Sequence, residues 1–340
     1  MKQKNKPVLS RRMAEGVYRI TLPLPGEKPG PVNVYLFMGE THTALLDTGT
    51  ARTFGHLSRA LAEHGLACSD IDRIVITHSH VDHYGAARKI LRASGSPIEV
   101  AANFEKTTSI ATGLGVSKET MAGFLALMGV PWPVRNAMRV LSSFFSLLGD
   151  RCRVTAFIQE GDVIQMGDYR LRIIETPGHT ADSICLYHEP TGILFSGDHI
   201  LPHITPNAFV MLEEGRYLPA RLSQREFYRS VDKVAEFSPA TIYPAHGRPI
   251  DDFQSIREMY VANFKEREEN IMAIVRRGDK TVYAIVRELF TNLNTARLPL
   301  EIFLAVSEVY THLQVLAEKG RVRLRRTVAG RLVVSPEVFR

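Results

Sequence analysis

Four side chains that can bind a metal ion lie within six positions of the chain. They are His78, His80, Asp82 and His83, and they follow directly on the apolar run 71–76. Neutral imidazoles and a carboxylate, with no thiolate among them, are the ligands that borderline divalent transition metals prefer. A chain that leaves a strand and enters a helix can arrange such residues around one point. The spacing therefore indicates a metal site at the end of a strand.

Three further ligand-type residues follow at long intervals, each after a short strand-like run and each beside a glycine. They are His179 in P-G-H-T, Asp198 in S-G-D-H and His246 in P-A-H-G. A neighbouring glycine permits a tight turn and a close approach of the backbone. Strand ends that gather at one edge of a sheet are a common place for an active site, so we expect these residues to join the first group.

The motifs T-H-x-H-x-D-H, G-H-T, G-D and A-H-G occur in this order over residues 77–247. In type and order they resemble those of the glyoxalase-type hydrolases in the metallo-β-lactamase superfamily. The resemblance implies a role for each residue of the set. His78, His80 and His179 would hold a first metal ion, Asp82, His83 and His246 would hold a second, and Asp198 would bridge both.

Asp47, in the segment 45–49 (L-L-D-T-G), matches the first motif of the same family. There it would accept a ring N–H from a ligand histidine and fix the tautomer of that histidine. The alternative is an ordinary turn at the end of a strand. His199 and His203 lie close to Asp198 in the sequence, and they either contact the substrate or outer metal shell or fill a loop.

The implied ligand set predicts hydrolysis. Two divalent ions ~3.5–4 Å apart can share a water molecule and lower its pKa from ~15.7 towards ~7. The hydroxide that bridges the metals would attack a carbonyl or phosphoryl centre, and Asp82 would orient it and receive a proton. Tyr84 is a candidate donor to a developing oxyanion, with packing in the core as the alternative. Zinc is the expected metal, although iron and manganese use the same nitrogen and oxygen ligands.

Length and composition predict a soluble enzyme of two domains. The chain has 340 residues, of which 45% are hydrophobic, enough for a large core. The N-terminus has no apolar stretch of signal-peptide length, and no run of ~18 apolar residues predicts a transmembrane helix. Cys68, Cys152 and Cys185 are few, odd in number and far apart, which argues against a disulfide framework. We therefore expect a cytoplasmic protein.

The net charge of +6 is unevenly distributed. Residues 1–12 contribute +5 and residues 319–331 contribute +6, so the rest of the chain carries −5. A uniformly basic surface of the kind that binds nucleic acid is therefore not expected.

The pattern of apolar residues predicts two β-rich halves with helices between them. In the first half we expect a meander over 16–47, helices over 52–63 and 84–93, and strands over 73–77 and 98–102. In the second half we expect strands over 163–166, 169–175, 183–187 and 193–196. Periodicity alone supports a mixed α and β fold. The family resemblance implies an α+β, four-layer αββα sandwich, for which we predict a catalytic domain over residues 1–262.

A helical insertion at about 105–150 interrupts the β-rich pattern. Segments 117–128 and 134–148 have helical spacing and many apolar residues, and G-V-P-W-P separates them. The hairpin either buries its apolar face on the sandwich or on a second subunit in a homodimer, or it forms a lid over a channel to the metals. A lid would suit an apolar substrate arm such as an acyl chain.

Residues 263–340 are predicted to form a separate module. Helices over 264–276, 282–290 and 299–319 precede a two-stranded hairpin made of 321–326 and 331–334. This order resembles a winged helix, and a similar module occurs in the branch of the superfamily that includes a mitochondrial endoribonuclease. The basic wing could bind phosphates. However, the third helix begins with apolar residues where a recognition helix needs polar ones, so structural support is favoured over nucleic acid as the role of this module.

Three functions remain after these observations. The favoured one is a binuclear hydrolase of a small-molecule carboxylic ester, thioester or lactone with an apolar acyl arm. An endoribonuclease or phosphodiesterase that uses the basic wing is the first alternative. A non-catalytic interaction protein is the second, but its sign would be a missing ligand and none is missing.

Overall fold

Each β-rich half of the chain builds one sheet. The structure, a computed structural model, describes residues 9–24, 29–103, 117–141, 149, 152–291 and 299–337. The first sheet has the strand order β1-β2-β3-β4-β5-β6-β7, with antiparallel pairing up to β4 and parallel pairing from β4 to β7. Its strands are β1 (Leu9–Ala14), β2 (Val17–Leu22), β3 (Val32–Met38), β4 (Thr43–Leu46), β5 (Arg73–Ile76), β6 (Glu99–Ala102) and β7 (Ala156–Phe157).

The second sheet has the order β12-β11-β10-β9-β8 and is antiparallel except for the parallel pair β11–β12. Its strands are β8 (Val163–Met166), β9 (Tyr169–Glu175), β10 (Ile184–His188), β11 (Ile193–Gly197) and β12 (Thr241–Pro244). The strands predicted over 163–166 and 169–175 have these bounds in the structure. The strand predicted over 183–187 is shifted by one residue at both ends, and the one predicted over 193–196 is one residue longer.

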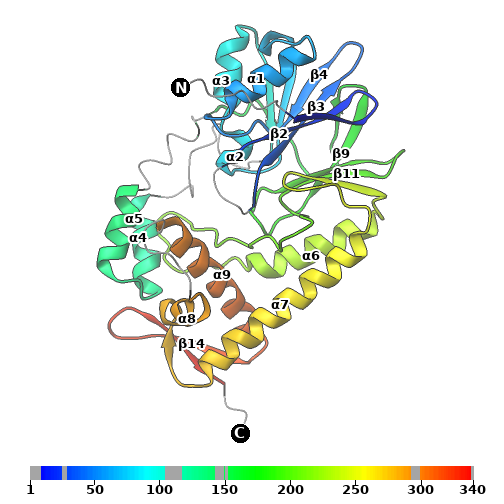
Figure 1. The fold of residues 1–340 in the computed structure, drawn as a ribbon. Coiled ribbons are helices and arrows are strands. Elements are labelled where there is room, and N and C mark those ends of the chain that lie inside the picture. Colours follow the sequence, from blue (N-terminus) through cyan, green and yellow to red (C-terminus); the bar gives the residue numbers. More distant parts are fainter. Residues whose placement is uncertain are drawn as a thin grey trace.

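Helices cover the outer face of each sheet. Figure 1 shows the layers from top to bottom: α1 and α3, the first sheet, the second sheet, and α6 with α7. These helices are α1 (Phe54–Glu63), α3 (Ala87–Ser94), α6 (Ser223–Glu236) and α7 (Phe253–Val275), with the short α2 (Val81–Tyr84) and η1 (Cys68–Asp70) in the connections. The predicted αββα sandwich is therefore confirmed.

Three hydrophobic clusters fill the spaces between these layers. Because successive side chains of a strand point to opposite faces, Val34 and Leu36 of β3 pack under α1 and α3, whereas Tyr35 and Phe37 pack between the sheets. A third cluster lies between the second sheet and the helices α6 and α7. Both faces of the central strands are buried, which explains why β3 is almost continuously apolar.

Two predicted helices were wrong, and one strand was not predicted. The helix expected to start at Tyr84 instead consists of two pieces, α2 and α3, with Gly85 and Ala86 between them. The helix predicted from Phe264 begins eleven residues earlier, at Phe253, where the Asp252 side chain caps it by accepting the N–H of Ser255. Leu9–Ala14, within and just beyond the basic N-terminal segment, forms the edge strand β1; charged side chains are common on edge strands.

The last part of the chain forms its own hydrophobic cluster. After α7 come β13 (Lys280–Thr281), α8 (Val282–Leu289), α9 (Pro299–Glu318), β14 (Val322–Arg326) and β15 (Leu332–Pro336), and the strands pair in the order β13-β15-β14. The insertion supplies α4 (Lys118–Leu127) and α5 (Trp132–Leu141). Its residues 104–116 and 142–148 lie outside the described part.

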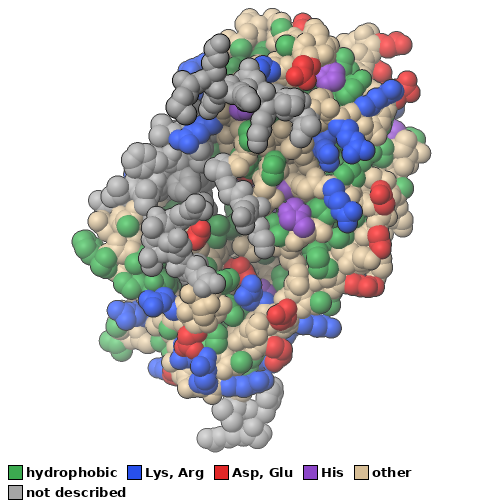
Figure 2. All heavy atoms as spheres, in the orientation of Figure 1, with side chains coloured by type: hydrophobic (Ala, Val, Ile, Leu, Met, Phe, Trp, Pro, Cys, Tyr) green, Lys and Arg blue, Asp and Glu red, His purple; other side chains and the backbone are tan. Residues whose placement is uncertain are grey.

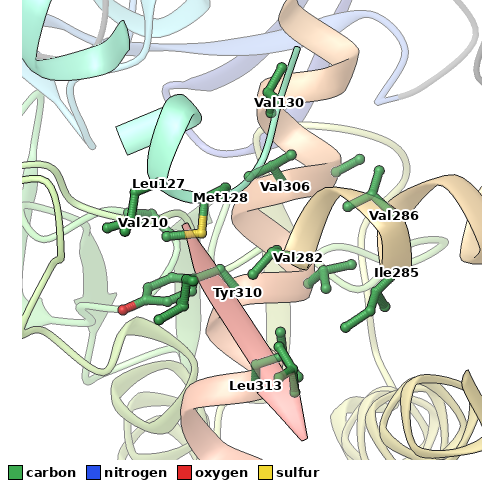
Figure 3. Packing of buried hydrophobic residues seen from close by; sticks show 14 of the residues in the cluster. Leu127, Met128, Val130, Val210, Val282, Ile285, Val286, Val306, Tyr310 and Leu313 are labelled. Atoms are coloured by element: carbon green, nitrogen blue, oxygen red, sulfur yellow. The ribbon is translucent and has the colours of Figure 1, made fainter. Parts of the chain in front are cut away.

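The described part of the helical hairpin packs on this C-terminal module rather than on the sandwich. Leu127, Met128 and Val130 join residues of α8 and α9 in one cluster, and Figure 3 shows them beside Val306 and Tyr310. The Tyr283 N–H also donates to the Met128 carbonyl at 2.9 Å. The apolar face of α4 and α5 is thus covered by α8 and α9, a partner that was not among the predicted ones.

Among the described residues, none of the helices is long and apolar enough to cross a membrane.

Candidate metal centre

The ends of strands bring the predicted ligands to one edge of the sandwich. His78, His80, Asp82 and His83 follow β5 directly, in the turn and in the helix α2. His179 lies in the turn between β9 and β10, Asp198 follows β11, and His246 follows β12. The strands β11 and β12 are parallel, and so are β4 and β5, so residues at their carboxyl ends lie at the same edge.

All seven residues come together in two adjoining groups. The ligand atoms of His78, His80, His179 and Asp198 lie within 4.8 Å of one another, and those of Asp82, His83 and His246 do likewise. Asp198 lies close to members of both groups, with its Oδ2 3.6 Å from Nε2 of His179 and 3.6 Å from Nε2 of His83. Its Oδ1 lies 3.3 Å from Nε2 of His246.

The outer ring nitrogens of three histidines are held by acceptors, which determines the tautomers. Nδ1 of His83 lies 2.7 Å from Oδ2 of Asp47. Nδ1 of His179 lies 2.9 Å from the carbonyl oxygen of Asn207, and Nδ1 of His246 lies 2.9 Å from that of Pro31. Carboxylate and carbonyl oxygens can only accept hydrogen bonds. Each Nδ1 therefore carries the hydrogen, and in the neutral ring Nε2 presents its lone pair to the centre.

Asp47 occupies the position expected of it from the sequence. Besides His83, its carboxylate accepts the N–H of Thr77 at 2.8 Å and the Thr77 hydroxyl at 2.9 Å. It is buried, and its φ of 62° lies in the left-handed region, which Asp tolerates better than most residues. Asp47 thus joins the end of β4 to the end of β5.

Two of the neighbouring glycines are required by the packing. Gly178 has a φ of +142°, and a Cβ at this position would lie 2.3 Å from the Cα of Phe227 on α6. Gly197 has a φ of +53°, and its Cβ would lie 2.9 Å from the Cβ of Thr77. The absence of a Cβ at these two positions therefore lets the turns that carry His179 and Asp198 approach Phe227 and Thr77 closely. The sequence indicated such a close approach of the backbone.

The chemistry of the cluster fits divalent metal ions. Nε2 of His78, His83 and His246 and Oδ1 of Asp198 are buried without a hydrogen-bond partner among the described residues. A buried polar atom without a partner is costly, and four of them around one point need a common partner. Nδ1 of His80 also faces Nε2 of His179 at 3.1 Å, an arrangement that a proton or a cation must bridge.

The electrostatics of the cluster agree with this chemistry. Burial and neighbouring imidazoles lower the pKa of His78 and His80, and they lower that of His179 to about 4. These rings are therefore neutral near pH 7, the form that binds metals. Burial alone would raise the pKa of Asp82, but His83 and His246 lower it to about 2. In the described part of the chain, Asp82 and Asp198 pair only with histidines.

The structure does not bring Tyr84 into the cluster. Its side chain is fully buried in the core beneath α1 and α3, and its hydroxyl has no partner among the described residues. Adjacent side chains on a helix diverge in direction, so His83 faces the cluster while Tyr84 faces the core. The geometry supports packing as the role of Tyr84.

The two additional histidines are loop residues. His199 is buried with its ring centroid 4.9 Å from that of Phe227. His203 is exposed, and its Nε2 lies 3.2 Å from the carbonyl oxygen of Pro29.

Sequence reasoning missed Phe209, which lies against two of the ligands. Its ring is edge-on to both His80 and His179, with centroids 5.1 Å from each. Asn207 was missed as well, because its contribution is a backbone carbonyl and any residue could provide it. Neither position shows a motif in the sequence, and only the folded loop brings them to the cluster.

Comparison with known proteins agrees with this site. The model of the Metallo-beta-lactamase superfamily matches residues 28–246, which include all seven candidate ligand residues. The chain belongs to the metallo-β-lactamase superfamily. This membership and the ligand set confirm the prediction of a metal-dependent hydrolase.

Two relatives extend the comparison. The chain is 29% identical to the probable metallo-hydrolase YqjP of Bacillus subtilis over 308 residues, which cover 89% of this chain and 92% of that protein. It is 28% identical over 180 residues to the acyl-coenzyme A thioesterase MBLAC2 of Bos taurus, covering 51% of this chain and 59% of that protein.

Solved structures of the superfamily share the fold over nearly the full chain. A metallo-beta-lactamase family protein from Thermus thermophilus has a TM-score of 0.76 at 24% identity and covers 95% of this chain and 99% of its own. A beta-lactamase domain protein from Burkholderia ambifaria has a TM-score of 0.78 at 21% identity, covering 96% and 94%. The shared region therefore extends beyond the sandwich into the C-terminal part.

Proposed function

We propose that this protein is a binuclear hydrolase that cleaves a small-molecule carboxylic ester, thioester or lactone with an apolar acyl arm. The observation that supports this most is the set of unpartnered ligand atoms that point at one centre from three histidines and Asp198. His78, His80 and His179 would hold one ion, Asp82, His83 and His246 the other, and Asp198 would bridge them. Zinc is the expected metal because nitrogen and oxygen ligands of this kind suit it.

Bound divalent ions would supply a water molecule of lowered pKa and would polarise the substrate carbonyl. Asp82 is suited to handle the proton. Its side chain is 21% exposed, whereas that of Asp198 is 8% exposed. Asp82 can therefore accept a proton from the attacking water and pass it to solvent, while Asp198 stays enclosed among the histidines.

The position of Phe209 supports a substrate that carries an apolar group next to the bond to be cleaved. Its ring is partly exposed and forms an apolar wall beside His80 and His179. An acyl chain or ring could pack on this wall while its carbonyl lies at the metal centre. The similarity to an acyl-coenzyme A thioesterase points to the same substrate class.

The described surface of the C-terminal module does not favour the endoribonuclease alternative. The helix α9 is buried on nearly all sides, so it offers no polar face to a groove. Three arginines of the wing are paired with carboxylates: Arg321 with Glu269, Arg323 with Glu337 and Arg325 with Asp279. In Figure 2, basic side chains on the lower part of this face are interspersed with acidic ones.

We also propose a two-domain organisation and a cytoplasmic location. The order of α7, β13, α8, α9 and the β14–β15 hairpin supports a winged-helix-like module. The three cysteines are buried and unpaired, which supports a reducing compartment.

The test is hydrolysis of a series of acyl thioesters, from short to long chains, by zinc-loaded protein, with His179→Ala as the inactive control. We expect kcat/KM to rise up to about fourfold for each methylene that packs on the protein, the equivalent of ~0.8 kcal/mol. Esters and lactones with the same acyl chains identify the leaving group. If no member of the three classes is hydrolysed faster than by the control, the proposed function is wrong, and single-stranded RNA becomes the next substrate.

A further inference from the structure

A short segment, residues 205–210, connects the metal centre to the C-terminal module. Three consecutive side chains of this segment, at positions 208–210, pack in three different places. Ala208 packs in the cluster under α6 and α7, and Val210 packs in the C-terminal cluster, where Figure 3 shows it beside Met128. Phe209, between them, lies against His80 and His179.

The segment is hydrogen-bonded twice to His179. The Asn207 carbonyl lies 2.9 Å from Nδ1 of the ring and accepts its hydrogen, and the Phe209 N–H donates to the His179 carbonyl at 3.2 Å. The first bond determines which ring nitrogen faces the metal centre, and the second fixes the backbone of the ligand. A displacement of 207–209 would therefore rotate or withdraw His179.

Helices α7 and α9 hold the other side of the same segment. The Val210 N–H donates to Oγ of Ser307 on α9 at 2.7 Å, and Ser307 is 1% exposed. Nδ2 of Asn263 on α7 donates to Oγ1 of Thr205 at 2.8 Å. The mostly buried Glu308 of α9 is bound by Arg267 of α7 at 2.8 Å and also takes a hydrogen bond from the Asn207 side chain.

We propose that the C-terminal helices act as a positioning device for the metal centre, in which Ser307 holds the 205–210 segment and the segment orients His179 and Phe209. The module would thus set the affinity of the first metal position and the placement of the apolar wall. This rests on the proposed function only in assuming that His179 is a metal ligand.

The experiment compares Ser307→Ala with Thr311→Val on the same helix. Thr311 lies one turn further along α9, is 2% exposed, and donates its hydroxyl to the Glu308 carbonyl within the helix. Both substitutions remove one buried hydroxyl from α9, but only Ser307 contacts the segment. Zinc affinity is measured by competition with a chromophoric chelator, and the ligand geometry is followed by the visible spectrum of the cobalt-loaded protein.

We expect Ser307→Ala to weaken the binding of one of the two zinc ions about tenfold, the lower end for partners of metal ligands, and to change the cobalt spectrum. Thr311→Val should match the wild type in both. The zinc and cobalt measurements need no substrate, so their result is independent of whether thioesters are hydrolysed.

The proposal is overturned if Ser307→Ala is folded and binds both zinc ions like Thr311→Val. If Ser307→Ala does not fold, the same measurements are made on Asn263→Ala. Asn263 is exposed on α7, so removal of its side-chain amide does not disturb the core. A measurable loss of zinc affinity in this variant supports the proposal, and unchanged affinity and cobalt spectrum overturn it.

Discussion

At the scale of single residues, Asp47 shows how a group outside the candidate ligand set can position one of its members. It is buried at the end of β4, accepts the Nδ1 hydrogen of His83 and holds both the N–H and the hydroxyl of Thr77. Burial alone would lower the pKa of His83, but Asp47, Asp198 and Asp82 raise it well above its ordinary value. The same negative charges favour a divalent cation at Nε2.

We expect Asp47→Asn to weaken metal binding about 10- to 100-fold, as for other partners of ligand histidines. An amide can still accept the Thr77 N–H, and Asn tolerates the positive φ of this position, so the fold should be retained. The lost group is the charged acceptor for His83. Zinc titration and circular dichroism check the two expectations.

The matched control for this substitution is Asp168→Asn. Asp168 lies in the turn between β8 and β9 and accepts the N–H of Glu40. Because Asp168 is not part of the candidate metal centre, the same change of charge at this position should leave the zinc affinity at the wild-type value. Equal affinity of all three proteins would show that the contact between Asp47 and His83 does not matter for metal binding.

At the scale of elements, α9 is the central helix of the C-terminal module. It is buried on nearly all sides and packs on α5, α6, α7 and α8. Several of its buried polar side chains have specific partners. Ser307 holds Val210, Gln314 donates to the carbonyls of Pro219 and Arg221, and His312 meets Gln224 of α6 at 3.0 Å.

His312 predicts a dependence of stability on pH. Burial, with the charges of Arg267 and Lys319, lowers its pKa to about 3, whereas an unfolded chain has a His pKa of about 6.5. Below pH 6.5 the unfolded state therefore binds a proton that the folded state does not. The stability contributed by the neutral ring is present above pH 6.5 and is lost progressively as the pH falls towards 3.

Denaturant unfolding at pH 7.5 and 5.5 measures this loss in the wild type and in His312→Gln. We expect the free energy of unfolding of the wild type to fall by about 1.4 kcal/mol more than that of the variant over this interval. The metal-centre histidines are present in both proteins and cancel in the comparison. The exposed His203, changed to Gln in the same way, serves as the control; equal pH dependence of all three would contradict a buried neutral His312.

At the scale of the whole molecule, the candidate metal centre combines residues from the two halves of the sandwich. His78, His80, Asp82 and His83 come from the first half, and the other three candidate ligands come from the second. Metal ions bound there would link the two sheets at their common edge. Because a ligand that binds only the folded state stabilises it, the metals should contribute to global stability as well as to chemistry.

Removal of the metals by a chelator should lower the melting temperature on the order of 10 °C, since binding at about a thousand times Kd stabilises by about 4 kcal/mol. Reloading with zinc should restore the original value. In the double variant His179→Ala and His246→Ala, the chelator should have much less effect. A melting temperature that does not respond to the chelator in the wild type would argue against metal binding at this centre.

The sequence by itself, read with the family resemblance of its motifs, predicted the candidate ligand residues and the αββα class. His78, His80, Asp82 and His83 are close in the chain, and the remaining ligands each follow a strand beside a glycine. Such signals are local, because ligand type, strand periodicity and turn chemistry act over a few residues. For the same reason the bounds of β8 and β9 were predictable from alternation alone.

Only the tertiary structure determined which segments distant in the sequence pack against each other. It placed Tyr84 in the core, covered the helical hairpin with α8 and α9, and brought Phe209 and the Asn207 carbonyl to His179. None of these follows from local pattern. An apolar helix face has the same sequence whether it packs on a sheet, on a second subunit or on another helix, and a backbone carbonyl carries no sequence signal at all. Only the packing of distant segments determines which of these partners is met.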